Sequence, residues 1–442
     1  MPGMLNFVTK RPAASRSRLN WADAGLSAIF AAVAVAIGLW GFGVLGHALQ
    51  TAASFNLWFQ ADSPRVIENL TDRRSNHYRT AVHPVASLLL TPGVIALHTL
   101  GVPALLACEV LILAAAAVCG GGFFIALRLL GLPKPAASVF VALYLSSAAF
   151  IYWYSQIELN TVGGATIVLA LLALAHGRTK SELWWVLVSA ATLSITVTNW
   201  SIGLAATLVR WPLKNTLSIS VAALATVILL SLVQSLTFWH AAWFFRPAAV
   251  TAEARWSALS SAHDELPTDR PSMNMRSLFL TTMVAPDPVV EVQDGDKVVT
   301  NQDVPATTGT PCALAAAIAW IALLGCGLIG AVGGLRNDLR RPVVAGLGLM
   351  LSGQMVLHSV YGNPTFLYAP HFLPLLAAFA ALSWFTRMRW VALALAAVVC
   401  VAGGVSNVQT FRSAAALANQ VIARGGNAIQ PAFPANDVLP AH

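Results

Sequence analysis

The chain has 442 residues, of which 57% are hydrophobic and only 10% are charged, and its net charge is +8. Soluble domains carry about a quarter charged residues, so this composition excludes a soluble globular enzyme and predicts an all-α, polytopic transmembrane helical bundle. The basic residues lie at the ends of apolar runs, as the positive-inside rule requires. The positive charge therefore does not indicate a nucleic-acid partner.

The N-terminal part of the chain is predicted to contain a tail, one span and a long outer loop. Residues 1–21 form a basic cytoplasmic tail, and residues 22–46 form a retained signal anchor that is the first span. The first outer loop is predicted over 47–103. Its apolar stretch at 84–100 is short and contains Pro92-Gly93, so it either crosses the bilayer or lies in the interface.

Basic residues further along the chain decide between these two topologies. Two basic pairs reach the cytoplasm only if 84–100 lies in the interface. They are Arg128 with Lys134, and Arg178 with Lys180. We therefore predict an interfacial helix and eleven spans in total.

The remaining spans are predicted in two groups, separated by a large outer loop at 245–311. The first group completes an N-terminal seven-span catalytic module over 22–244, and the second is a C-terminal four-span module over 312–406. The tail at 407–442 is predicted to be outside and loosely ordered. The predicted spans are 104–129, 135–154, 159–176, 183–197, 199–212, 215–244, 312–334, 342–361, 369–386 and 389–406.

Charged and aromatic side chains gather at the outer ends of these spans. Acids are scarce, with 18 Asp and Glu in the chain, and a charge near the bilayer is costly unless it is paired or functional. The candidates are Asp62 and Glu158 as catalytic acids, Arg65, Arg79, His83 and His371 as ligands of a donor phosphate, and Tyr78, Tyr361 and Tyr368 as substrate contacts.

These residue types suit the transfer of a group from a lipid-linked phosphate. A carboxylate such as Asp62 can deprotonate an acceptor hydroxyl. Arginine and histidine can hold the phosphate and stabilise its charge as it leaves. No Walker loop and no glycine fingerprint after a strand occur, so no nucleotide is predicted. The five cysteines lack CxxC spacing, so no metal is predicted, and a divalent ion is the less favoured alternative.

Each candidate also has a structural alternative. An acid before a proline can cap a helix, basic side chains can extend to lipid headgroups, and tyrosines can belong to an aromatic belt. The alternatives are a helix cap for Asp62, a boundary ion pair for Glu158, headgroup contacts for Arg79 and His83, belt positions for Tyr361 and Tyr368, a satisfied buried histidine for His371, and a structural turn for Asn199.

The order of these motifs resembles the GT-C superfamily of polytopic membrane glycosyltransferases. An acid lies in the first outer loop (Asp62 in 60–65), His83-Pro84 opens an apolar stretch, and Glu158 closes the second outer loop. A tyrosine- and proline-rich pattern follows in 361–374. The resemblance covers most of residues 20–390.

The resemblance implies roles for matching residues. Asp62 would be the catalytic base, Glu158 would assist the acceptor or a metal, and the loop at 246–310 would close over the donor. Two features depart from relatives: Ser63 follows Asp62 where some have a second acid, and Gln156-Ile157-Glu158 keeps one acid where others have two. These departures argue against metal dependence and a peptide acceptor.

The predicted function is therefore an inner-membrane, multi-pass glycosyltransferase whose active site faces the periplasm or exterior. It would move a sugar from a polyprenyl-monophosphate donor to a glycan, lipid or protein acceptor, with inversion and without a cofactor. Its partners are these substrates and the lipid bilayer, with no nucleic acid. The alternatives are a secondary transporter or lipid-linked sugar translocase, which would place acids along a path within the spans, and a non-catalytic assembly subunit.

Overall fold

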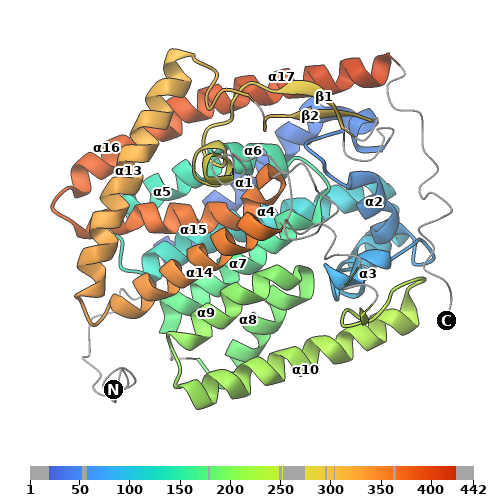
Figure 1. Ribbon diagram of the computed structural model, residues 1–442, viewed down its shortest axis with the longest axis horizontal. Coiled ribbons are helices and arrows are strands. Elements are labelled where there is room, and N and C mark those ends of the chain that lie inside the picture. The colour runs from blue at the N-terminus through green and yellow to red at the C-terminus, as the bar shows by residue number, and fades with distance from the viewer. Residues whose placement is uncertain are drawn as a thin grey trace.

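The computed structural model shows a bundle of helices with one small β-hairpin (Figure 1). Several sequence-based predictions fall outside the described residues: most of the N-terminal tail, Arg178, the middle of the large outer loop, and residues 425–442. The described residues are 19–51, 57–177, 180–247, 251, 274–293, 296–302, 304–361 and 365–424.

Eight helical segments in the described part of the chain are long and apolar enough to cross a membrane, which confirms the predicted helical membrane architecture. They are α1 (Trp21–Thr51), α4 (Ala104–Leu129), α7 (Leu159–His176), α10 (Leu213–Thr237), α13 (Pro311–Leu335), α14 (Arg341–Val360), α15 (Ala369–Ala381) with the flanking turns η5 (Thr365–Tyr368) and η6 (Leu382–Phe385), and the continuous segment α16 (Arg389–Val398), η7 (Val399–Gly403) and α17 (Gly404–Ala423).

Three predicted spans correspond to shorter helices. The span at 135–154 divides into α5 (Lys134–Leu145) and α6 (Ala148–Trp153), because the Ser147 hydroxyl caps a new helix at Phe150 N, 3.2 Å away. The next pair is α8 (Glu182–Ile195) and α9 (Trp200–Leu208), joined by η3 (Val197–Asn199). Each is shorter than the roughly 20 residues that cross a bilayer, so the count of eleven stays a prediction.

Helices α1 and α4 pack along each other and are joined at one end by a buried ion pair. Arg128 Nε donates to Asp23 Oδ1 at 2.6 Å, and Asp23 is fully buried. At its other end α1 changes direction at Gly46, whose φ of 72° favours glycine. This bend coincides with the predicted end of the first span.

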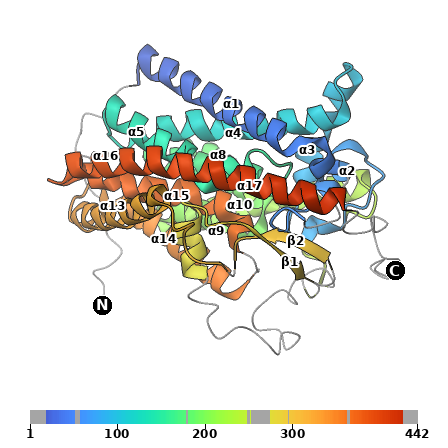
Figure 2. The ribbon, with the colours of Figure 1, turned by 90° about the horizontal axis from the view of Figure 1, so that it is seen from above.

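The first outer loop folds into three short helices at one side of the bundle. They are α2 (Ser63–Thr71), η1 (Tyr78–Ala81) and α3 (Ala86–Thr99), and Figures 1 and 2 show α2 and α3 side by side. Val66, Val94 and Cys108 share one buried apolar cluster. The middle of α3 thus packs against α2 and the first turns of α4, and the interfacial placement of 84–100 stays a prediction.

The large outer loop packs back onto the first outer loop. Strands β1 (Val289–Gln293) and β2 (Asp296–Thr300) form an antiparallel hairpin. Val299 N donates to Leu57 O at 2.8 Å, and Phe59 N donates to Val299 O at 3.0 Å. An earlier part of this loop contains the π-helical turn η4 (Ser277–Thr281). The backbone before Asp62 is therefore paired with a segment far along the chain.

The prediction that the tail is loosely ordered from residue 407 is wrong for 407–423. Helix α17 continues to Ala423 and runs past the hairpin in Figure 2. The Asn407 side chain donates to Ser146 O and Met283 O and accepts from Ala285 N, all within 2.9 Å. The Phe411 ring packs against Trp40, Trp58 and Tyr152. Only one face of the helix is apolar, so the hydropathy falls although the helix continues.

Candidate active site

Asp62 follows a strained turn in the first outer loop. Phe59 and Gln60 have φ angles of 47° and 63°, in the left-handed region that non-glycine residues rarely adopt. Asp62 then occupies the N-cap position of α2, with Pro64 in the first turn, yet its side chain makes no capping hydrogen bond. The helix-cap alternative thus agrees with the position of Asp62 at the start of α2, but the Asp62 carboxylate does not cap the helix.

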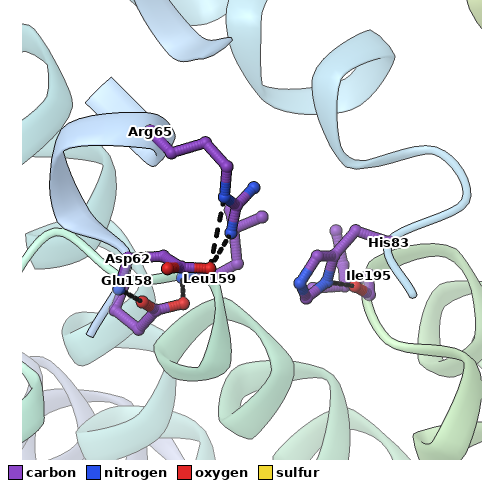
Figure 3. Close-up of polar contacts among 6 residues, drawn as sticks. All are labelled: Asp62, Arg65, His83, Glu158, Leu159 and Ile195. Atoms are coloured by element: carbon purple, nitrogen blue, oxygen red, sulfur yellow. Dashed lines mark hydrogen bonds and ion pairs between the residues drawn. The ribbon is translucent and has the colours of Figure 1, made fainter. Parts of the chain in front are cut away.

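The Asp62 carboxylate instead pairs with Arg65. Arg65 Nη2 and Nε donate to Asp62 Oδ2 at 2.7 and 3.2 Å (Figure 3). The Arg65 side chain is 3% exposed and that of Asp62 is 31% exposed. Burial raises the pKa of Asp62, but the charges of Arg65 and Arg79 outweigh burial, and the net pKa is lower than that of a free aspartate. Asp62 is therefore an ionised carboxylate with an open side.

Glu158 lies directly behind Asp62 and caps α7. Its Oε2 accepts from Asp62 N at 3.0 Å, and its Oε1 accepts from Leu159 N at 2.8 Å (Figure 3). Glu158 is 3% exposed. Burial, followed by the negative charge of Asp62, raises the pKa of Glu158. The predicted acids thus form a pair in which Asp62 is the more readily ionised and Glu158 fixes its backbone.

A network of buried amides, which the sequence analysis did not select, holds this pair. Gln50 Nε2 donates to Gln156 Oε1 at 2.9 Å, and Gln156 Nε2 donates to Ser63 Oγ at 2.5 Å. All three residues are at most 1% exposed. The network joins the end of α1, the start of α2 and the segment before α7. Glutamine residues close to the predicted acids are the one sequence signal that could have indicated this network.

A small, open cleft with positively charged side chains lies beside Arg65, the partner of Asp62. Four cationic or imidazole side chains from α2, η1 and the segment after it line one small volume, with asparagine, serine and threonine between them. The polar residues lining it include Arg65, Asn69, His77, Arg79, Thr80 and His83. The structure thus brings together three of the four predicted phosphate ligands.

His83 is a neutral member of this pocket. Its Nδ1 lies 2.6 Å from Ile195 O (Figure 3), and because a carbonyl only accepts, Nδ1 carries the proton. Burial, with the charge of Arg65, lowers the pKa of His83 to about 3. Nε2 is therefore a hydrogen-bond acceptor at neutral pH, which suits a hydroxyl better than a phosphate oxygen.

We expect the affinity of this pocket for a phosphodiester anion to change less than about twofold between pH 8 and about pH 5.5. With a pKa of about 3, His83 stays neutral over this range and adds no positive charge on acidification. A binding titration at both pH values checks this. Glu158→Gln is the control, since Glu158 has a raised pKa. A tenfold gain at low pH in that variant would contradict a neutral His83.

The remaining predicted residues lie in two places. Tyr78 is 44% exposed, and the Arg65 guanidinium lies 6.0 Å from the centre of its ring. Tyr361 ends α14. Tyr368 precedes α15, and its ring centre lies 4.4 Å from that of His358 and 6.3 Å from that of His371. Tyr78 therefore lies near Arg65 but does not line the charged pocket, whereas Tyr368 and His371 lie near each other at the start of α15.

Within the described residues, no three His, Cys, Asp or Glu side chains come close enough together to hold a metal ion.

Comparison of the chain with protein-family models, curated proteins and solved structures finds no match. The resemblance to the GT-C superfamily therefore depends on the residues and their arrangement alone.

Proposed function

We propose that this chain is a membrane glycosyltransferase that moves a sugar from a polyprenyl-monophosphate donor to an acceptor hydroxyl at the outer face of an inner membrane. One observation carries the proposal: the ionised, partly exposed carboxylate of Asp62 is paired with Arg65, which lines a pocket together with Arg79. A base beside a site for a leaving phosphate is what this transfer needs.

In this reaction the acceptor oxygen attacks the anomeric carbon as the bond from that carbon to the phosphate oxygen breaks. The acceptor proton passes to Asp62, and polyprenyl phosphate leaves with the bonding electrons. Attack opposite the leaving group inverts the anomeric centre. Arg65 and Arg79 stabilise the negative charge that grows on the phosphate.

Donor binding would also make Asp62 a better base. The charges of Arg65 and Arg79 lower the pKa of Asp62 in the free protein. A phosphate held by the same two side chains would offset part of that positive charge, so the pKa of Asp62 would rise when the donor is bound. Glu158 would hold the Asp62 backbone through Oε2 while the proton is transferred.

The transporter alternative has less support among the described residues. Asp23 lies at the end of its span and is paired with Arg128. Glu109 lies in the second turn of α4, 4.0 Å from His47. Neither acid lies in the middle of its span, as a path for a substrate or ion would require.

Binding and transfer measurements with Arg79→Gln test the proposal. We expect this variant to bind polyprenyl phosphate about tenfold more weakly, since one charge-assisted hydrogen bond contributes about 1.5–3 kcal/mol. Arg73→Gln is the matched control: Arg73 is a nearby arginine that is exposed and does not line the pocket. Phosphate binding at this pocket would be refuted if wild type and Arg79→Gln bound polyprenyl phosphate equally well, and neither bound it better than polyprenol.

A further inference from the structure

A second group of polar side chains lies deep in the bundle. We call Asn199, Gln354, His358 and His371 the histidine–amide cluster. Each is at most 1% exposed. In the described part of the chain, none of their eight side-chain nitrogen and oxygen atoms has a partner with the distance and angle of a hydrogen bond. The backbone of Tyr361 lies near His358, and that of Asn160 lies near His371, without meeting that geometry. Buried polar groups are normally paired, so this cluster calls for a ligand or ordered water.

Three different elements carry these side chains, and a fourth, α7, packs against them. Gln354 and His358 are one turn apart on α14, which puts them on the same face. His371 is in α15, and Asn199 is in η3. A Cβ atom on Gly163 of α7 would lie 2.5 Å from His371 Nε2 and 3.1 Å from Asn199 Nδ2. Glycine at 163 therefore leaves the space that the two polar groups face.

The cluster adjoins the charged pocket through the segment that carries Asn199. Val197 N donates to Val82 O, and Val85 N donates to Ser194 O, both at 3.0 Å. His83 lines the charged pocket, and its Nδ1 donates to Ile195 O between these two backbone hydrogen bonds. The segment that carries Asn199 is therefore paired directly with the segment that carries His83.

The two places differ in chemical character. The charged pocket contains Arg65 and Arg79, which suit an anion. The histidine–amide cluster contains two imidazoles and two carboxamides, and each of these groups can both donate and accept a hydrogen bond. Hydroxyl groups do the same, so a polyhydroxyl compound can satisfy the cluster without burying a charge. The Tyr368 ring beside His358 adds an apolar face.

We propose that the histidine–amide cluster binds the hydroxyl groups of the donor sugar while the charged pocket binds the phosphate. This inference rests on the proposed function and adds a sugar-binding subsite to it. It assigns His371 to the sugar rather than to the phosphate, and it gives Asn199 a binding role in place of a purely structural one.

The test measures binding to the full-length protein in lipid nanodiscs. The probes are polyprenol, polyprenyl phosphate, and polyprenyl phosphate linked to mannose, glucose or arabinose. We expect wild type to bind one of the three sugar-linked lipids at least tenfold more tightly than polyprenyl phosphate. Asn199→Leu and Gln354→Met, which keep the side-chain shape, should each reduce that preference about tenfold and leave the affinity for polyprenyl phosphate unchanged.

Thermal unfolding of the ligand-free variants provides a second, independent measurement. Asn199 and Gln354 make no hydrogen bonds, so replacing them with apolar residues should leave the unfolding midpoint unchanged or raise it. Asn407→Leu is the matched control, because Asn407 is equally buried and is fully hydrogen-bonded. Its midpoint should fall while the sugar preference stays. A fall of similar size in all three variants would mean that the cluster is structural.

The possible outcomes separate this inference from the function it rests on. If polyprenyl phosphate binds no better than polyprenol, both the proposed function and the subsite are refuted. If polyprenyl phosphate binds but no sugar-linked lipid is preferred, or the preference survives in Asn199→Leu and Gln354→Met, only the subsite is refuted. The cluster would then hold water alone.

Discussion

Asp62→Asn is expected to lower the rate of sugar transfer by roughly 10²–10⁴-fold, the usual contribution of a general base. The amide has nearly the same shape as the carboxylate but cannot accept the acceptor proton. Donor binding should remain, because Arg65 and Arg79 are still present in the pocket. The measurement is transfer from a polyprenyl-phosphate-linked sugar under single-turnover conditions, with donor affinity measured in parallel.

Asp72→Asn is the matched control for this experiment. Asp72 ends the same short helix and is exposed, and its carboxylate accepts from Arg74 N at 2.7 Å. Its replacement should leave the transfer rate within about twofold of wild type, the size expected for a surface change. Retained turnover in Asp62→Asn would exclude Asp62 as the base. Equal losses in both variants would indicate damage to the outer loop.

Asp23→Asn should produce the largest loss of stability, about 3 kcal/mol in the free energy of unfolding. Removing one partner of a buried ion pair leaves the other charge without its counterion, which typically costs about 3–5 kcal/mol. The lower end applies because the pair lies at the ends of α1 and α4 rather than midway along them. Reversible unfolding of the purified protein in mixed detergent measures the effect.

A second ion pair at helix ends serves as the comparison. Arg341 Nη2 and Asp338 Oδ1 are 2.8 Å apart, but the Asp338 side chain is 82% exposed. Exposed pairs contribute about 0–1 kcal/mol, so Asp338→Asn should change the unfolding free energy by less than about 1 kcal/mol. If both variants lose the same amount, burial of Asp23 is not the cause.

The shared location of Asp62 and Glu158 was predictable, because the distribution of basic residues places both acids on one side of the membrane. Their direct contact was not. It depends on a turn in which Phe59 and Gln60 adopt positive φ angles, and neither residue type indicates such a turn. Pairing with Val299 stabilises this turn, and no local pattern relates residues so far apart in sequence.

Hydropathy located the long helices well and the short ones poorly. The end of the first span at Gly46 and the start of α7 after Glu158 agree with the predicted boundaries. The break at Ser146-Ser147 and the extension of α17 beyond Asn407 were missed. A serine cap is a weak signal within an apolar run, and a helix with one apolar face resembles a polar tail. Asn199 lies in the turn between α8 and α9, as predicted, but its burial was not predictable, because its neighbours come from distant helices.

The pairing of β2 with Leu57 and Phe59 has a consequence for biosynthesis. The chain that carries Asp62 emerges from the ribosome and enters the membrane long before Val299 has been synthesised. Among the described residues, Leu57 O and Phe59 N pair with Val299, so the turn before Asp62 reaches its final conformation only after the hairpin has been synthesised. A nascent chain arrested before residue 289 would have α1 to α10 but an incomplete turn before its candidate base.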